Sequence, residues 1–338
     1  MSSIRIISAA DVKALFTLPM AIAAVEQAYL QKHTGEGAVW PLVFHEFDPG
    51  HADLDIKSGN LDAAGIFGLK LVSWFGANPE KGLPALYGTS LICDLATGTP
   101  KAILNAGPIT DLRTGAAAAV GAKYLARKDS KVLLMVGCGE LSPYLIAAGF
   151  LALPQLQQVI VVNPHRPESA GKKLGALQEK VHALLAEASC DRPVAISAAE
   201  DVQQAVEQAD VIFTATPSRT PMIRKEWVKS GTHISCVGAD MSGKQEIDEL
   251  ILAEARVFGD DALQCFSVGE CEAAAKAGLL PALAGEIGAV IAGAVPGRTD
   301  DHQITVFDST GIALQDLASA AVILQKAAAE DIGQVVEL

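Results

Sequence analysis

Two glycines that follow an apolar stretch could hold a phosphate group. The segment VLLMV, residues 132–136, is typical of a buried strand, and Gly137-Cys138-Gly139 links it to the helical segment LSPYLIAAGFLA. Gly137 permits a tight turn, Gly139 lets a pyrophosphate approach the backbone, and the helix N-terminus offers unpaired N–H groups. Ser142 replaces the usual third glycine and is small enough for close packing. An ordinary strand-to-helix turn is the alternative, but a second strand follows at the right distance, which favours a dinucleotide site.

The end of that second strand indicates which dinucleotide is bound. In VIVVNPHRPESA the strand ends at Asn163, where NAD-selective enzymes usually place Asp or Glu to bind the ribose 2′-hydroxyl. Asn163 would not repel a 2′-phosphate, and Arg166, with His165 beside it, could bind that phosphate by charge-assisted hydrogen bonds. We therefore predict that NADP (as NADPH) is preferred, with NAD as the second choice. A solvated loop arginine is the alternative for Arg166.

The elements that position this site follow from hydrophobic periodicity. After Asp129, strand-like and helix-like segments alternate, which is typical of a parallel sheet built from βαβ units. A strand, a turn and a long amphipathic helix are predicted over residues 304–328. The other strand candidates in this part are residues 131–137, 158–163, 193–197, 210–216, 233–240 and 255–260.

The first part of the chain has a different pattern. Residues 9–33 carry apolar side chains at helical spacing after Ser8 or Asp11, either of which can cap a helix. Between residues 39 and 103, short β-prone segments alternate with turns and predict a mainly antiparallel sheet. Residues 109–127 form an alanine-rich segment, typical of a helix, that could connect two domains.

Length and composition exclude several classes of protein. A chain of 338 residues exceeds the usual size of a single core, so two domains are expected. The formal charge of −13, without a basic run, argues against nucleic acid as a partner. Six scattered cysteines without a CxxC pair indicate reduced thiols and no metal site. Without a signal-peptide pattern or a run of about 18 apolar residues, we expect a cytoplasmic protein that does not enter the membrane.

Four ordered blocks of the sequence resemble a known family. The blocks are GLKLVSWFGANPEKGLPALYGTSLICDLATGTP, ITDLRTGAAAAVGAKYLAR, CVGADMSGKQEID and ITVFDSTGIALQDLA. Their order and spacing, which extend from Gly68 towards the C-terminus, are similar to the signature of the ornithine cyclodeaminase/mu-crystallin family. The resemblance implies a nicotinamide cofactor and an oxidoreductase that acts on carbon–nitrogen bonds.

The resemblance also implies an architecture. It is an α/β fold in which a Rossmann dinucleotide-binding domain, residues 116–310, is inserted in an α+β substrate-binding and dimerisation domain. That second domain would comprise residues 1–115, completed by residues 311–338, and would form a homodimer through its sheets. The residues expected to bind the cofactor are Thr114, Gly137, Gly139, Glu140, Leu141, Asn163, Arg166, Thr216 and Ser309.

Three residues match reacting groups of the family. Lys70, in GLKLV, would meet the substrate carboxylate and the reacting centre, and Arg113, in LRTG, can bind a carboxylate bidentately. Asp240 follows an apolar strand, where open α/β folds place ligand chemistry, and would pair with the substrate nitrogen. Such a carboxylate stabilises the iminium that accepts a hydride at C2. The alternatives are surface cations for Lys70 and Arg113 and a helix cap for Asp240, but the matched blocks favour the catalytic roles.

Two departures from the family pattern bear on the reaction. Many members carry an Arg shortly after a Pro in the first strand, whereas this chain has WPLVFHEF, so Lys57 in LDIKSGN is expected to bind the substrate in its place. Ornithine cyclodeaminases have SEMT before the LRT motif, whereas this chain has LNAGPIT. A cation at Lys57 also does not suit the distal ammonium of a diamine. These differences favour a reductase.

The sequence therefore leaves three functions open. The first is an NAD(P)H-dependent reductase of cyclic ketimines or 2-imino acids, similar to Δ1-pyrroline-2-carboxylate reductase or alanine dehydrogenase, with a small 2-imino or amino acid as its substrate. The second is an ornithine cyclodeaminase, which converts L-ornithine to L-proline and ammonia. The third is a mu-crystallin-like protein that binds a small ligand without catalysis. The presence of Lys70, Arg113 and Asp240 argues against the third.

Overall fold

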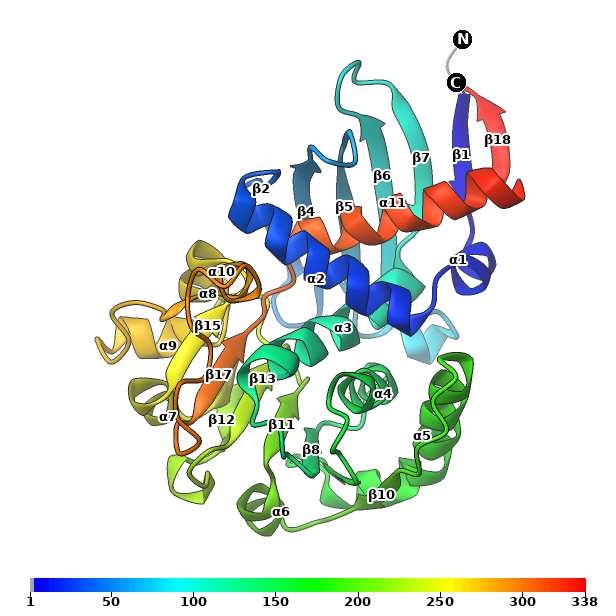
Figure 1. The fold of residues 1–338 in the computed structure, drawn as a ribbon. Coiled ribbons are helices and arrows are strands. Elements are labelled where there is room, and N and C mark those ends of the chain that lie inside the picture. Colours follow the sequence, from blue (N-terminus) through cyan, green and yellow to red (C-terminus); the bar gives the residue numbers. More distant parts are fainter. Residues whose placement is uncertain (1–2) are drawn as a thin grey trace. The chain divides into compact units, whose positions relative to one another are not determined.

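The computed structural model describes residues 3–338, which form two compact units (Figure 1). The mixed-sheet unit comprises Met1–Arg113 and Ile312–Leu338, and the parallel-sheet unit comprises Thr114–Gly311. Residues 1 and 2, with which the predicted first domain begins, lie outside the described residues. The predicted α/β fold class is confirmed.

The mixed-sheet unit contains most of its strands in the first third of the chain. Its elements are β1 (Ser3–Ile7), α1 (Ala9–Leu15), α2 (Leu18–Thr34), β2 (Gly37–Val39), β3 (Val43–Asp48), β4 (Ala52–Leu61), β5 (Ile66–Phe75), a 3₁₀ turn (Asn78–Lys81), β6 (Leu86–Asp94), β7 (Pro100–Asn105), the start of α3 (Gly107–Leu125), α11 (Ala313–Glu330) and β18 (Gln334–Glu337).

The sheet of this unit is mainly antiparallel, as the sequence predicts. Its strand order is β18-β1-β7-β6-β5-β4-β2, with β3 also paired to β4, and only β1 and β7 pair in parallel. Helices α2 and α11 cross one face of this sheet (Figure 1). The packing of α11 is tight, because a Cβ atom on Gly68 of β5 would lie 3.2 Å from the Leu317 side chain.

The helical segment predicted over residues 9–33 is broken into two helices. Ser8 is the N-cap of α1, and its hydroxyl accepts the Asp11 N–H while the Asp11 carboxylate accepts the Ser8 N–H at 2.9 Å. The first helix ends at Leu15, and α2 starts again at Leu18 with Pro19 in its first turn. Proline lacks an N–H donor and is tolerated only in the first turn of a helix, so Pro19 fits the start of a second helix and not the interior of a longer one.

The last helix is not simply amphipathic either. All residues from Ala313 to Ala320 are buried, so the first half of α11 has no solvent face. Its polar residues Gln315, Asp316 and Ser319 lie among these buried positions and make hydrogen bonds there. A periodic pattern cannot reveal that a polar helix face is covered, because that depends on the surrounding chain.

The parallel-sheet unit alternates strands and helices. Its elements after α3 are β8 (Val132–Val136), α4 (Ser142–Ala152), β9 (Gln158–Val162), α5 (Pro167–Glu187), β10 (Ala195–Ala198), α6 (Val202–Gln208), β11 (Val211–Thr214), β12 (Arg219–Ile223), a 3₁₀ turn (Lys225–Trp227), β13 (His233–Cys236), β14 (Gln245–Ile247), α7 (Glu249–Glu254), β15 (Arg256–Gly259), α8 (Ala262–Val268), α9 (Cys271–Lys276), β16 (Gly285–Glu286), α10 (Ile287–Ile291) and β17 (Thr305–Asp308).

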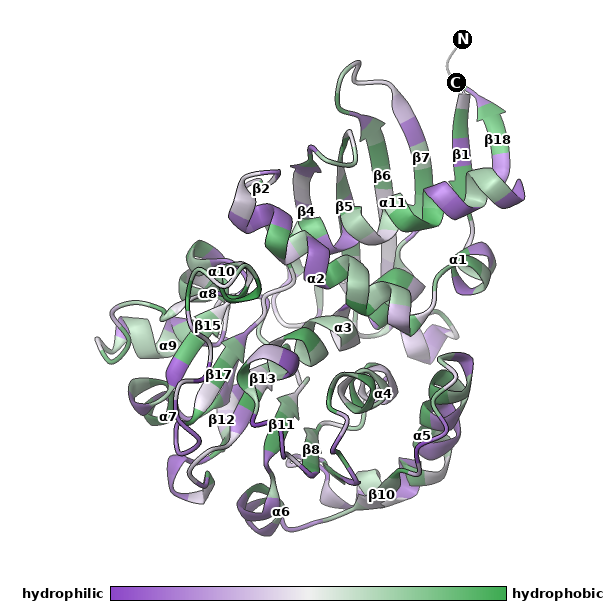
Figure 2. Cartoon of the chain, in the orientation of Figure 1, coloured by the Kyte–Doolittle hydropathy of each residue, from purple (hydrophilic) through white to green (hydrophobic). Residues whose placement is uncertain are grey.

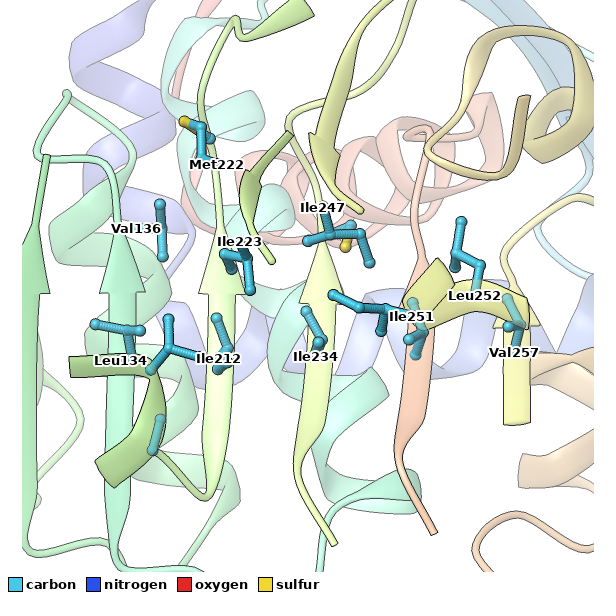
Figure 3. Packing of buried hydrophobic residues seen from close by; sticks show 14 of the residues in the cluster. Leu134, Val136, Ile212, Met222, Ile223, Ile234, Ile247, Ile251, Leu252 and Val257 are labelled. Atoms are coloured by element: carbon cyan, nitrogen blue, oxygen red, sulfur yellow. The ribbon is translucent and has the colours of Figure 1, made fainter. Parts of the chain in front are cut away.

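The main sheet of this unit is parallel throughout and has the order β10-β9-β8-β11-β13-β17-β15-β16. The chain therefore runs from β8 outward through β9 to β10 and then returns to form β11 on the other side of β8. This reversal creates a topological switch point at the carboxyl end of β8. Leu134, Ile212 and Ile234 project from neighbouring strands into one buried apolar cluster, to which Ile251 and Leu252 of α7 also belong (Figure 3).

Two further observations concern the whole described chain. No helix within residues 3–338 is long and apolar enough to cross a bilayer. All six cysteines are free thiols, and five of them are buried.

Candidate functional site

The glycine loop after β8 lies at the switch point of the parallel sheet. Gly137 has φ +110°, and a Cβ atom there would lie 3.0 Å from the Ala215 carbonyl oxygen, so glycine is required. At Gly139 a Cβ atom would meet no heavy atom within 4 Å. Helix α4 begins after Leu141 without a side-chain cap. Open space beside an uncapped helix N-terminus fits the pyrophosphate of a dinucleotide.

The loop after β9 is shaped by Asn163. The Asn163 side-chain oxygen accepts the N–H groups of His165 and Arg166, each at 3.2 Å, and its side-chain nitrogen donates to the Ser169 hydroxyl at 2.9 Å. Asn163 thus organises the turn that follows β9. Arg166 is exposed, and no side-chain hydrogen bond or ion pair of Arg166 is found within residues 3–338.

Thr216 and Ser309 follow two other strands of the sheet, β11 and β17. The Thr216 hydroxyl donates to Glu246 at 2.8 Å, and the Ser309 hydroxyl donates to Asp260 at 2.9 Å. Glu246 and Asp260 are both fully buried, and no local sequence pattern marks either as an acceptor. Of the other predicted cofactor residues, Glu140 is exposed in the glycine loop, Leu141 is partly buried there, and Thr114 is buried in α3.

Asp240 stands in the turn after β13. Its carboxylate is partly exposed, with 43% of the side-chain surface accessible, and accepts a hydrogen bond from Lys244 at 2.6 Å. The Ser242 hydroxyl and the Gly243 N–H donate to Glu272 and hold the turn from the other side. Strand β14, not a helix, follows this turn, so the interpretation of Asp240 as a helix cap is wrong.

The predicted cations of the mixed-sheet unit lie together. Lys57 and Lys70 are paired across β4 and β5, and their side chains are buried, with 5% and 2% of the residue surface exposed. The Lys70 ammonium lies 3.0 Å from both Asp316 oxygens and donates a hydrogen bond to Oδ1. The Arg113 Nε lies 3.6 Å from the same Oδ1. Two buried cations therefore share one buried carboxylate.

A second set of contacts orients Arg113. Its Nη1 donates to the Gln315 side-chain oxygen at 3.2 Å, and the Gln315 side-chain nitrogen donates to the Tyr29 hydroxyl at 2.6 Å. Gln315 of α11, which is itself bound to Tyr29 of α2, thus orients the Arg113 guanidinium. Asp316 and Gln315 are absent from the sequence-based set of site residues, since the amphipathic pattern predicted for this helix does not single them out.

The electrostatic surroundings of Lys70 make its ammonium group unusually acidic. Burial, followed by repulsion from Arg113, lowers the pKa of Lys70 from 10.5 to about 8, while the Asp316 carboxylate acts in the opposite direction. The alternation along β5 is consistent with this, since Lys70 faces the buried side while Leu71 is exposed. In a strand with one buried face, the buried side chains are usually apolar and the exposed ones polar, so Lys70 and Leu71 reverse the usual pattern.

The predicted site residues thus gather in two sets. Lys57, Lys70 and Arg113 lie together in the mixed-sheet unit. In the parallel-sheet unit, the glycine loop, Thr216, Asp240 and Ser309 follow β8, β11, β13 and β17, which are consecutive neighbours in the sheet. A Cβ atom on Gly137 would lie 3.2 Å from the Thr216 side chain, so these two loops are in contact.

Comparisons with known proteins agree over nearly the whole chain. The model of the ornithine cyclodeaminase/mu-crystallin family matches residues 4–331. The iminosuccinate reductase of Paracoccus denitrificans is 34% identical over 334 residues, covering 98% of this chain and 99% of the relative.

Two solved structures have closely similar folds. An archaeal alanine dehydrogenase dimer with bound NAD has a TM-score of 0.86 and 34% sequence identity, covering 99% of both chains. The Δ1-pyrroline-2-carboxylate reductase of Thermococcus litoralis, in complex with NADH and L-proline, has a TM-score of 0.89 and 26% identity, covering 98% of this chain and 99% of that one.

Proposed function

Because the chain belongs to the ornithine cyclodeaminase/mu-crystallin family, we propose that it is an NAD(P)H-dependent reductase of cyclic ketimines or 2-imino acids. The iminosuccinate reductase, the alanine dehydrogenase and the pyrroline carboxylate reductase described above support reduction over cyclodeamination. The observation that carries the proposal is the buried pair Lys70 and Arg113, which share the single carboxylate of Asp316. A substrate carboxylate would complete that charge arrangement.

Each assigned residue then has one task. Lys70 and Arg113 bind the substrate carboxylate, and Lys57 adds a third cation beside Lys70. Asp240 stabilises the protonated imine nitrogen and holds a proton there as the carbon is reduced to the amine. The glycine loop, Thr114, Glu140, Leu141, Asn163, Arg166, Thr216 and Ser309 would hold and orient the dinucleotide cofactor, which would supply the hydride when bound. A cytoplasmic location is part of the same proposal.

A substrate panel tests the proposed reaction. Purified protein is mixed with NADPH or NADH and with Δ1-pyrroline-2-carboxylate or with the imines that pyruvate and oxaloacetate form with ammonia, and nicotinamide oxidation is followed by absorbance. Separate mixtures of NAD⁺ and L-ornithine are monitored for ammonia. Reduction of at least one imine is expected, whereas ammonia release from ornithine without imine reduction would identify a cyclodeaminase instead.

NADPH is expected to give a higher kcat/KM than NADH. Asn163 places no negative charge near the ribose, and the exposed Arg166 guanidinium can bind the 2′-phosphate. The structures of two relatives contain NAD or NADH, so a preference for NADPH would distinguish this protein from them. Arg166→Ala should reduce the preference, whereas Arg219→Ala, in the same unit but after β11, should not. A tenfold or larger preference of the wild type for NADH would contradict the assignment.

The mixed-sheet unit exposes an apolar sheet face that is suited to a homodimer. This outer face, turned away from α2 and α11, contains Val43, Phe47, Leu71, Phe75 and Tyr87, all exposed. Figure 2 shows much of β6 in hydrophobic colours, whereas β4 is mixed. A contiguous apolar patch of this kind commonly marks an interface, and the archaeal alanine dehydrogenase is a dimer. We therefore propose a homodimer formed through this face.

Leu71→Glu should dissociate that dimer, because it places a charge in the middle of the outer face. Light scattering after size-exclusion chromatography measures the mass. Val335→Glu is the matched control, since Val335 is an exposed valine at the far edge of the same sheet, in β18. A monomeric wild type, or a Leu71→Glu variant that stays dimeric, would contradict the proposed interface.

A further inference from the structure

Glu246 of β14 lies where two loops of the parallel-sheet unit meet. Its Oε1 accepts the Thr216 N–H at 2.7 Å and the Thr216 hydroxyl at 2.8 Å. Its Oε2 accepts the Thr214 hydroxyl at 2.6 Å and the Gly238 N–H at 3.0 Å. One fully buried carboxylate therefore connects the loop after β11 with the loop after β13.

The four donors to Glu246 are neutral N–H and O–H groups. Burial raises the pKa of Glu246, and the hydrogen bonds from Thr214, Thr216 and Gly238 oppose that rise because they stabilise the charged form. Glu270 accepts the backbone N–H groups of Glu246 and Ile247, so the backbone that carries the Glu246 side chain is held as well. Four donors converging on one carboxylate form a network in which the loss of one acceptor leaves several groups unsatisfied.

Gly238 and Thr216 pack closely around this carboxylate. A Cβ atom on Gly238 would lie 2.5 Å from the Glu246 Oε2 and 2.5 Å from the Thr216 carbonyl oxygen. On the other side, the Thr216 side chain lies against the glycine loop, 3.2 Å from where a Cβ atom on Gly137 would be. Contacts therefore continue from the glycine loop through Thr216 and Glu246 to Gly238.

We infer that Glu246 is a positioning residue that holds the cofactor loop at Thr216 and the loop of Asp240 in one fixed arrangement. Gly238, which donates to Glu246, precedes Asp240 by two residues, so a shift of Glu246 moves both loops together. The inference rests on the proposed function, which assigns Thr216 to the cofactor and Asp240 to the reaction. It adds that cofactor affinity and turnover depend jointly on a residue that touches neither ligand.

Glu246→Gln is the first test. An amide keeps the size of the side chain, but its NH₂ group cannot accept the two hydrogen bonds that one carboxylate oxygen now accepts. We expect the Kd for NADPH to rise and kcat to fall, each by about tenfold or more, since buried donors lose their acceptor. Kd is measured by titration of nicotinamide fluorescence, and kcat with saturating cofactor and the imine that the wild type reduces best.

Asp210→Asn is the matched control. Asp210 is another buried carboxylate in the same unit, but it lies just before β11, at the amino end of that strand, where it accepts the Lys131 N–H at 2.8 Å and pairs with Lys229 at 2.9 Å. This variant should lose thermal stability and keep its Kd for NADPH. If Asp210→Asn loses cofactor affinity as Glu246→Gln does, the effect follows from general destabilisation and the inference is overturned.

Gly238→Ala keeps the inference testable if Glu246→Gln does not fold. The added methyl group pushes on Glu246 and on Thr216 at once, so the same joint loss of affinity and turnover is expected. Wild-type Kd and kcat in either variant would overturn the positioning role. Failure of the wild type itself to bind NADPH or NADH would instead contradict the proposed function, so the two failures are distinguishable.

Discussion

Asp240→Asn is expected to lower kcat for imine reduction by about 10²- to 10⁴-fold while NADPH affinity hardly changes. Asparagine keeps the shape of the side chain but removes the negative charge that stabilises the iminium nitrogen. In the enzyme the Asp240 carboxylate is held by Lys244 at 2.6 Å, and its partial exposure leaves surface for a ligand. Turnover of the imine and titration of NADPH, measured side by side on folded protein, test this expectation.

Asp201→Asn is the control for Asp240. Asp201 caps α6 in the same unit, where its carboxylate accepts the Gln204 N–H at 2.9 Å. Asparagine caps helices about as well as aspartate, so this change should leave both turnover and stability nearly unaltered. A loss in Asp240→Asn of less than about fivefold would fall below the range for positioned acid–base groups. Asp240 would then serve only to hold its turn through Lys244.

Lys70→Met should lower kcat/KM for the imine by about 10²- to 10³-fold and leave NADPH affinity unchanged. The reason is that the substrate carboxylate loses its buried charged partner, and truncating one partner of such a pair costs several kcal/mol. Methionine fills a similar volume in the buried position of β5 but cannot bind a carboxylate. The loss should appear mainly as a higher KM, since Lys70 binds the substrate before and during the reaction. Normal substrate kinetics in a folded Lys70→Met enzyme would exclude this lysine from the site.

The same lysine predicts a pH dependence. Burial lowers the pKa of Lys70 to about 8, so the ammonium is charged below this pH and becomes a neutral amine above it. Wild-type kcat/KM should therefore fall as pH rises through about 8. Asp316→Asn removes the attraction that keeps Lys70 protonated, and the falling limb should move to lower pH. A wild-type profile that is flat to well above pH 8, or a limb that does not move, would contradict this role.

Local sequence determined the dinucleotide loop and the alternation of strands and helices around it. The glycine loop depends on residues next to one another, since an apolar strand, Gly137, Gly139 and an uncapped helix all lie within a short segment. Alternating strands and helices also impose a parallel sheet with connections of one hand. The position of Asp240 directly after the apolar strand β13 could also be predicted from neighbouring residues alone. Lys70 was assigned from the resemblance to the family, which matches it to a reacting group.

Tertiary structure alone decided which polar groups support those residues. Asp316 meets Lys70 across 246 positions of the chain, and Glu246 meets Thr214 across 32. Asp316 lies in a helix with a periodic pattern, and Glu246 in a three-residue strand, so neither had a local signal. A polar side chain in such a segment is equally compatible with solvent and with a buried network. Only the packing of distant elements removes the water and supplies the partners, which is why the supporting carboxylates could not be inferred from the sequence.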